Sequence, residues 1–177
     1  MTTLGEPETM SAAPIRITAA QGIVDFYDAF SASDFETMHR MMHPDCTLDF
    51  PGSSFPNRTQ GREAIIGLFQ GVQAAMNSTL RFHNKWALFN GEQVAVHWFT
   101  TGQPAHGGRY MNRGVAWYRL EDGLIREFQD FFDTEIIAAF WPGGAPCTDF
   151  AKAEALVQRL CAYATPEALA RLNSFAA

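Results

Sequence analysis

Asp130 and His97 are the residues whose chemistry stands out in this sequence. Asp130 lies within the segment Phe128–Phe132, where its carboxyl group has aromatic neighbours. Such surroundings remove water from a carboxylate, which raises its pKa and makes the ionised form a stronger proton acceptor. His97 could orient this carboxyl, share its proton or act as the paired acid. Two plainer interpretations stay open: Asp130 bonded to a loop amide or to Arg126, and His97 as a core histidine bonded to Asn84.

Other patterns that carry chemistry are missing from the sequence. The histidines His39, His43, His83, His97 and His106 show no metal-ligand spacing. There is no glycine-rich phosphate loop and no Gly-x-Ser-x-Gly motif, and no cysteine has the context of a nucleophile. We therefore expect neither a metal nor a cofactor.

The composition indicates one folded domain with a sizeable core. The chain has 177 residues, of which 47% are hydrophobic and 18% charged. A net charge of −6 without a basic stripe argues against nucleic-acid and anionic-membrane partners. The apolar runs are too short to span a bilayer, the first fourteen residues lack a signal-peptide core, and three cysteines show no paired spacing. We therefore expect a cytoplasmic protein.

Aromatic residues make up 13% of the chain, including 15 phenylalanines. This content has two interpretations. It is typical of an aromatic core, and it is also typical of a cavity that binds an apolar small molecule.

Periodicity and turn signals predict helices first and strands afterwards. We expect helices at 18–31, 33–42 and 62–75, a short strand at 46–50 and a loop at 51–56. The predicted strands are 79–89, 92–101, 109–120 and 124–132, followed by helices at 134–140, 149–163 and 166–174. This order predicts an α+β fold with helices packed on one face of the sheet. Residues 1–15 are expected to be a mobile tail, 16–140 the main domain and 141–177 a helical extension.

The first predicted hairpin places one apolar face toward the helices. A two-residue turn at Asn90-Gly91 pairs Phe89 with Glu92 and sets Asn84 opposite His97. Side chains alternate along a strand, so the predicted inner face holds one set of residues: Leu80, Phe82, Asn84, Trp86, Ala95, His97 and Phe99. Val96 and Trp98 then fall on the outer face, as a possible dimer surface.

The second hairpin allows two registers. A three-residue loop sets Gly114 opposite Asp130 and leaves room above the sheet at Gly114 and Ala116. A two-residue Asp122-Gly123 turn would instead bring Trp117 into that room. We favour the first register, in which Asp130 faces a hollow.

Helix and strand patterns together predict the lining of this hollow. Tyr27 lies on an inward helix face, and Asp49 ends the first strand, where a surface acid is the plainer interpretation. The residues expected to contact a ligand are Tyr27, Phe30, Asp49, Phe50, Phe69, Asn84, Trp86, Phe99, Asn112, Tyr118 and Phe128.

The ordered set of motifs resembles the nuclear transport factor 2-like superfamily and, within it, the SnoaL-like group. It consists of three N-terminal helices, the strand end Leu48–Gly52, Gly61–Ile65 opening a helix, the hairpin 118–125 and the segment Asp130–Asp133. The resemblance implies a cone-shaped α+β fold in which a curved mixed sheet and three N-terminal helices enclose a pocket, with extra C-terminal helices. It also implies a homodimer. Relatives include ketosteroid isomerases, scytalone dehydratase, limonene-epoxide hydrolase, polyketide cyclases and non-catalytic members.

The resemblance transfers to the catalytic positions only in part. Asp130 falls where the epoxide hydrolases keep a water-activating acid, but their arginine and second aspartate fall at His97 and Phe99. The acid of the polyketide cyclases falls near Ala116, and the proton-shuttling aspartate of the isomerases falls at or beside Phe50. A histidine of scytalone dehydratase lies close to His97.

We expect a small cofactor-free enzyme that performs isomerisation, cyclisation, dehydration or epoxide hydrolysis. Its substrate would be an apolar polyketide-, terpenoid- or steroid-like molecule, with Asp130 as base and His97 as partner. The alternative is a non-catalytic carrier or sensor of an apolar ligand. Tyr27, Asn84 and His97 are the expected hydrogen-bond donors to an oxyanion.

Overall fold

The computed structural model of the chain describes residues 12–50 and 58–175. In chain order the elements are α1 (Ala20–Ala32), α2 (Phe35–Met41), β1 (Met42–Asp49), β2 (Arg58–Gln60), α3 (Arg62–Ala75), β3 (Arg81–Asn90), β4 (Gln93–Gly102), β5 (Tyr110–Glu121), β6 (Leu124–Phe132), α4 (Thr134–Phe140), the 3-10 turn η1 (Pro142–Gly144), α5 (Ala151–Cys161) and α6 (Pro166–Asn173). The predicted loop at 51–56 lies outside the described residues.

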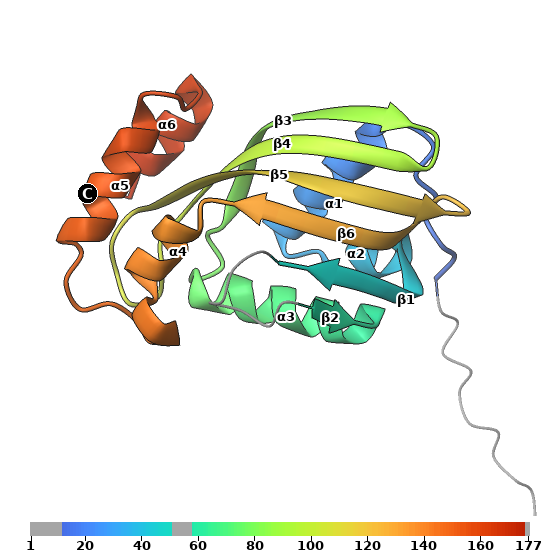
Figure 1. Cartoon of the computed structure of the whole chain (residues 1–177), viewed down its shortest axis with the longest axis horizontal. Coiled ribbons are helices and arrows are strands. Elements are labelled where there is room, and N and C mark those ends of the chain that lie inside the picture. The colour runs from blue at the N-terminus through green and yellow to red at the C-terminus, as the bar shows by residue number, and fades with distance from the viewer. Residues whose placement is uncertain (1–11, 51–57, 176–177) are drawn as a thin grey trace, which may run out of the picture.

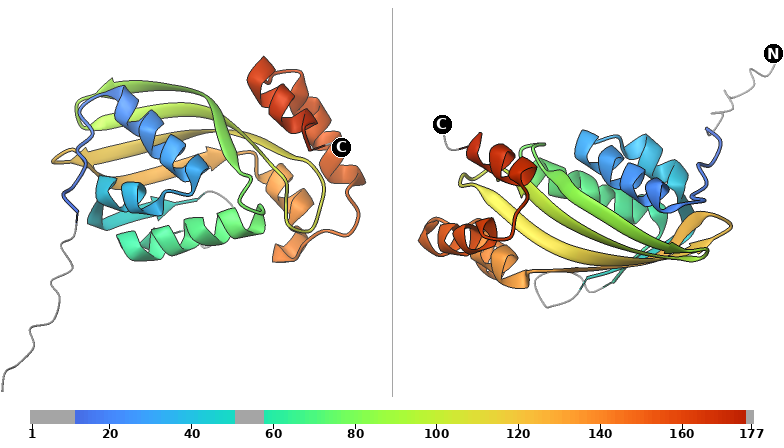
Figure 2. Two further views of the ribbon diagram at one scale, coloured as in Figure 1. Left: turned by 180° about the vertical axis from the view of Figure 1, so that it is seen from behind. Right: turned by 90° about the horizontal axis from the view of Figure 1, so that it is seen from above.

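The strands form one curved, open sheet in the order β2-β1-β6-β5-β4-β3. β1 runs parallel to β6, and the other neighbouring pairs are antiparallel. Helices α1, α2 and α3 lie along the concave side of the sheet, and α4, α5 and α6 gather at one end of it (Figures 1 and 2). The expected α+β class and the curved mixed sheet are thereby confirmed.

Several predicted helix ends need correction. The helix predicted at 18–31 begins at Ala20, after Ala19, and no side chain caps it. Ser33 ends α1 in a left-handed conformation (φ 58°), and Asp34 caps α2 by accepting a hydrogen bond from the Thr37 amide at 3.0 Å.

Residues just before α1 hold the chain against the body of the protein. Ile15, which falls in the predicted tail, donates a backbone hydrogen bond to the Arg40 carbonyl at 2.9 Å. Ile17 is buried and donates to the Gly123 carbonyl at 2.7 Å. Residues 1–11 of the predicted tail lie outside the described residues.

The first hairpin turns one residue later than predicted, and this hairpin also contains an irregularity. Asn90 pairs with Gln93, and the register shifts in β3 between His83 and Trp86. Because of this shift, residues of β3 with the same parity point to one face before the irregularity and to the opposite face after it. Phe82 is therefore buried on the concave side, whereas Trp86 is about half exposed on the outer side.

The facing of β4 is the reverse of the prediction. Val94, Val96 and Trp98 are buried on the concave side. His97 is the direct neighbour of Val115, which is exposed on the outer face. The predicted inward positions of His97 and Phe99, and the predicted outward position of Trp98, are therefore wrong. The prediction assumed that β3 alternates regularly from Phe82 to Trp86. The irregularity between them places Phe82 on the concave face and Trp86 on the outer face, and His97 pairs with Trp86.

The second hairpin has the two-residue turn that was the less favoured prediction, yet Asp130 lies on the concave face, as the favoured register predicted. Glu121 pairs with Leu124 around a two-residue turn in which Asp122 and Gly123 both have positive φ. The register then shifts by one residue, and Asp130 lies opposite Ala116 rather than Gly114. The extra residue restores the alternation that a two-residue turn would have reversed. Asp130 therefore shares the concave face with Gly114 and Ala116, as predicted.

The Trp98 indole ring occupies the space above Gly114. These two residues are direct neighbours across β4 and β5. A Cβ atom at Gly114 would lie 2.4 Å from Trp98 Cζ2 and 2.6 Å from the Phe131 carbonyl oxygen. Glycine is therefore required for the ring to approach β5 this closely, and the register predicted from sequence alone did not foresee that a tryptophan fills this room.

The extra C-terminal helices pack on the end of the sheet. α6 contacts β3 and β4, and α5 contacts α4 and β5. Glu167 of α6 lies 3.4 Å from the buried His83 ring, and Arg109 forms an ion pair with Glu154 of α5. In the part of the chain that the structure describes, no helix has the length and apolar character needed to cross a bilayer.

Replacing Gly114 by Ala is expected to destabilise the protein by about 1–3 kcal/mol, because the added methyl group meets both the Trp98 ring and backbone. Gly71→Ala is the matched control. Gly71 lies inside α3 with open space beside it, so alanine there is expected to stabilise by about 0.5–1 kcal/mol. Urea unfolding measures both. Equal stabilities of Gly114→Ala and wild type would contradict the close approach.

Candidate active site

A cavity of about 570 Å³ lies between α3, the concave face of the sheet and the α4–η1 segment. Most of its lining is apolar, and the polar side chains that reach it are Trp98, Thr100, Tyr110 and Asp130. The full lining is Phe30, Phe50, Gly67, Leu68, Phe69, Gly71, Val72, Ala75, Met76, Leu80, Phe82, Trp98, Thr100, Tyr110, Asp130, Phe132, Ile137, Trp141 and Gly144. The volume falls within the range of pockets for small organic molecules.

Asp130 places a carboxyl group in this apolar cavity. Burial raises its pKa to about 7, and the Trp98 N–H opposes this shift. Oδ1 has no hydrogen-bond partner among the described residues. Arg126 instead contacts Glu121 at 3.2 Å. The structure therefore does not support the plainer interpretation in which Arg126 neutralises Asp130.

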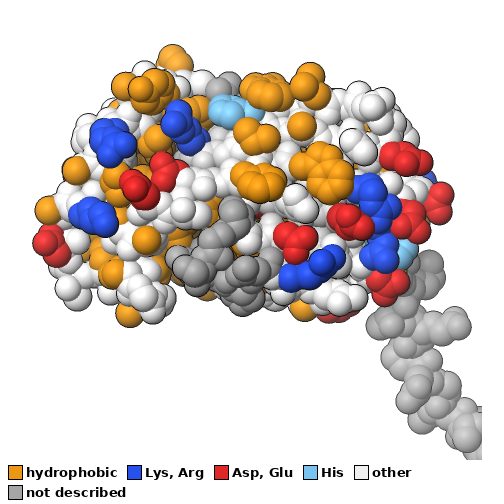
Figure 3. Space-filling model, viewed as in Figure 1, with side chains coloured by type: hydrophobic (Ala, Val, Ile, Leu, Met, Phe, Trp, Pro, Cys, Tyr) orange, Lys and Arg blue, Asp and Glu red, His pale blue; other side chains and the backbone are white. Residues whose placement is uncertain are grey.

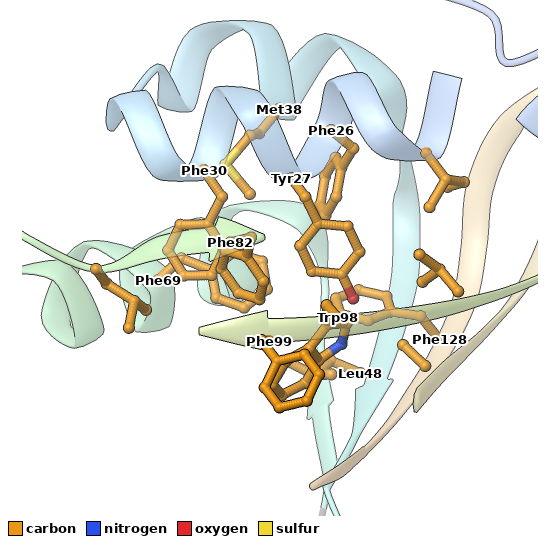
Figure 4. Packing of buried hydrophobic residues seen from close by; sticks show 14 of the residues in the cluster. Phe26, Tyr27, Phe30, Met38, Leu48, Phe69, Phe82, Trp98, Phe99 and Phe128 are labelled. Atoms are coloured by element: carbon orange, nitrogen blue, oxygen red, sulfur yellow. The ribbon is translucent and has the colours of Figure 1, made fainter. Parts of the chain in front are cut away.

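Two buried tyrosines lie close to Asp130. The Tyr118 hydroxyl donates a hydrogen bond to the Tyr27 hydroxyl oxygen at 2.6 Å. Burial raises the pKa of both hydroxyls, and the Asp130 charge raises both further. Both tyrosines are therefore neutral near pH 7. Figure 4 shows the Tyr27 hydroxyl directed toward the Trp98 indole nitrogen.

Trp98 is the functional candidate that sequence reasoning missed. Its N–H lowers the pKa of both Asp130 and Tyr27, which places the indole nitrogen near the two groups. Yet Nε1 is buried and meets the distance and angle of a hydrogen bond with no described residue. The small residues Gly114 and Ala116 were the available signal, because they leave space that a neighbouring side chain can cross.

His97 lies on the other side of the sheet from Asp130. Its ring stacks on Trp86 with centroids 5.7 Å apart and meets the Phe99 ring edge-on at 5.4 Å. It contributes to an open groove on the outer face, together with Arg113 and Phe131. The expected Asp130–His97 pair is therefore not formed.

The aromatic residues among the predicted ligand contacts divide into three groups. Phe30, Phe50 and Phe69 line the cavity. Tyr27, Tyr118 and Phe128 are buried in the aromatic core beside it. Trp86 is about half exposed on the outer face, whereas Phe99, on the same face of β4 as His97, is buried. The side chain of Asn84 lies outside the described part of the chain.

Asn112 and Asp49 have structural partners of their own. Asn112 is buried, donates from Nδ2 to the Tyr110 hydroxyl oxygen at 3.0 Å, and accepts from the backbone amides of Arg113 and Asp133. Asp49 forms an ion pair with Arg58 at 3.7 Å at the strand end. Neither residue lines the cavity.

The C-terminal part of the chain supplies lining that was not predicted. Ile137, Trp141 and Gly144 contact the cavity, and the Trp141 ring packs against Tyr110 at 6.1 Å. Over residues 12–50 and 58–175, no three histidine, cysteine or carboxylate side chains converge as metal ligands would.

Residues 23–128 match the SnoaL-like domain family. The solved structures that resemble this chain include a protein of Xanthomonas campestris described provisionally as a polyketide cyclase (21% identity, 65% of this chain and 90% of that chain, TM-score 0.58). TerC, co-crystallised with polyporic acid, is 21% identical over 64% of this chain and 90% of its own, with a TM-score of 0.58. A Bacillus subtilis protein described provisionally as an isomerase is 15% identical over 73% and 96%, with a TM-score of 0.63.

At these identities the structural similarity shows a shared fold only. A search of curated proteins gives no match. The chain belongs to the SnoaL-like domain family.

Asp130→Asn is expected to remove a pH dependence of stability. An unfolded aspartate has a pKa of about 3.9, whereas burial raises that of Asp130 to about 7. Between these values the folded state holds a proton that the unfolded state has lost. The free energy of unfolding of the wild type therefore falls as pH rises from about 4 to 7, by at most about 1.4 kcal/mol per pH unit. Urea unfolding at several pH values measures both proteins. Parallel curves would contradict the raised pKa.

Proposed function

We propose that this protein is a cofactor-free enzyme that moves a proton on an apolar small molecule, with Asp130 as the general base. The observation that carries the proposal is a carboxyl group in an apolar cavity with its pKa raised to about 7. A base with this pKa is largely ionised just above neutral pH and is a much stronger acceptor than an ordinary aspartate.

The lining supports an apolar polyketide-, terpenoid- or steroid-like substrate. Aromatic rings from three parts of the chain surround the space, including Phe30 of α1, Phe69 of α3 and Phe132 of β6. The names of the structural neighbours support the same class, since they include a polyketide cyclase, an isomerase and a protein crystallised with polyporic acid. Proton abstraction is a first step common to isomerisation, cyclisation and dehydration, and the same base could activate water for epoxide opening.

A panel of cyclic ketones in deuterated water tests this proposal. The wild type is expected to exchange protons next to the carbonyl, and NMR measures the rate. Asp130→Asn should lower that rate by about 10²-fold or more. Below pH 7 the wild-type rate should fall about tenfold per pH unit, because the base becomes protonated. Exchange that survives in Asp130→Asn would show that Asp130 is not the base.

The second candidate function is a carrier or sensor of an apolar ligand. The hydrogen bond from Tyr118 to Tyr27 favours it, because it engages the Tyr118 hydroxyl proton, which could otherwise be donated to a substrate. A carrier would bind the same ketones in the cavity without accelerating exchange. Binding combined with the background exchange rate would therefore favour this function over catalysis.

We also propose that the outer face of the sheet pairs with a second copy of the chain. Trp86, His97, Val115 and Phe131 form one row of direct neighbours across β3, β4, β5 and β6. Trp86, Val115 and Phe131 are 48%, 41% and 50% exposed. Hydrophobic side chains gather on this face in Figure 3. Contiguous exposed apolar surface of this kind is typical of interaction sites.

Phe131→Arg is expected to convert the dimer to a monomer, because the guanidinium group would be buried against an apolar surface. Light scattering coupled to gel filtration measures the mass. Ala74→Arg is the control, since Ala74 is exposed on α3, on the opposite side of the sheet. A dimer that persists in Phe131→Arg, or a monomeric wild type, would contradict this interface.

A further inference from the structure

We propose that the indole N–H of Trp98 binds a carbonyl or enolate oxygen of the ligand, directly beside the carbon that Asp130 deprotonates. The substrate class is then a ring ketone with an acidic C–H next to its carbonyl. This inference rests on the proposed function, because it assigns the second half of the same site.

The first argument is the hydrogen-bonding state of the two groups. Trp98 Nε1 and Asp130 Oδ1 are both buried, and both lack a hydrogen-bond partner among the described residues. A buried donor or acceptor without a partner is costly, so native proteins retain few of them without a role. Both side chains line the cavity, where an oxygen or an acidic hydrogen of a ligand would satisfy them.

The second argument is the path between the two groups. Trp98 stands on β4 and Asp130 on β6, with only β5 between them, so their backbones are about 10 Å apart. The β5 residues opposite them on the concave face are Gly114 and Ala116. Since neither carries more than a methyl group, the indole crosses β5 toward the Asp130 carboxyl. One planar ligand can therefore contact both groups.

The other polar groups at the cavity already have partners. Tyr110 accepts a hydrogen bond from Asn112; burial raises the pKa of its hydroxyl, and the interactions with Asn112 and Thr100 oppose that rise. Tyr27 accepts from Tyr118. His97 lies beyond the sheet. Among the described residues that line the cavity, Trp98 Nε1 and Asp130 Oδ1 are the fully buried side-chain atoms without a hydrogen-bond partner, and Trp98 Nε1 is the donor of the two.

The resulting step needs no co-reactant. Asp130 takes a proton from the carbon next to the carbonyl, and the C–H electron pair forms a carbon–carbon double bond. The π electrons of the carbonyl move to oxygen, whose negative charge the Trp98 N–H stabilises. Return of the proton to the same carbon gives exchange. In a ketone with a second C=C conjugated with the enolate, return of the proton from Asp130 to the far end of that dienolate completes a double-bond isomerisation and regenerates the carboxylate.

Binding of naphthalene and of ionised 2-naphthol to variants tests the role of Trp98. In Asp130→Asn the neutral amide stands for the protonated acid, and naphtholate stands for the enolate. Absorbance reports the ionisation of the bound naphthol, and dissociation constants are measured for both probes. The readout is the ratio of the two constants, since a general loosening of the cavity weakens both.

Adding Trp98→Phe to Asp130→Asn is expected to weaken naphtholate at least tenfold relative to naphthalene, which corresponds to about 1.4 kcal/mol. Adding Trp117→Phe is the matched control, since Trp117 stands on the opposite face of β5 from Ala116 and should leave the ratio unchanged. If phenylalanine at position 98 prevents folding, benzothienylalanine there keeps the bicyclic shape and lacks only the N–H.

The outcomes separate the two proposals. A naphtholate-to-naphthalene ratio that stays within twofold on loss of the Trp98 N–H overturns the donor role and leaves Asp130 as the proposed base. Failure of naphthalene to bind the wild type overturns the apolar-ligand site, and the role of Trp98 falls with it. A tenfold change in the ratio confined to the position-98 variants supports both.

Discussion

Loss of water around the Asp130 carboxyl is the constraint that organises this protein. An ionised carboxylate is unfavourable in an apolar cavity unless hydrogen bonds replace its water. Among the described residues, Asp130 Oδ1 has no such bond, and the pKa of the group is raised to about 7. A sequence selected for stability alone would gain from an apolar or amide side chain here. The buried carboxyl therefore supports the proposal that Asp130 acts on a ligand.

The fold around Asp130 keeps the space beside it available. The concave face of the sheet, α1 and α3 enclose a cavity that the side chains only partly fill, and α4 with η1 contributes to its lining. Gly114 and Ala116 let the Trp98 indole lie against β5 instead of standing above it. The same sheet presents a row of apolar side chains, Trp86, Val115 and Phe131, on its outer face.

Much of the architecture could be predicted because helix periodicity and turn residues are local signals. The position of Asp130 on the concave face was also correct, although for an incomplete reason. The favoured turn was wrong, and the one-residue shift in the second hairpin restored the predicted face. The shift within β3 had the opposite effect, because it left His97 and Trp98 on the faces opposite to those predicted.

Such shifts depend on packing between strands and leave little trace in the sequence, so the facing of single residues is harder to predict than the strands themselves. The prediction of the site was affected most. Because the predicted facing of β4 was reversed, His97 was expected beside Asp130, whereas the structure places Trp98 there. The contribution of Ile137 and Trp141 was missed for a related reason: the docking of a C-terminal helix on the cavity is a tertiary event.

The most direct measurement is the ionisation of Asp130 itself. Carbon-13 NMR of protein labelled at the aspartate carboxyls follows each group through a pH titration, and Asp130→Asn assigns the signal. We expect a midpoint near pH 7, about three units above that of an ordinary aspartate. A midpoint near pH 4 would mean that water reaches the carboxyl freely, and Asp130 would then have no special capacity as a base.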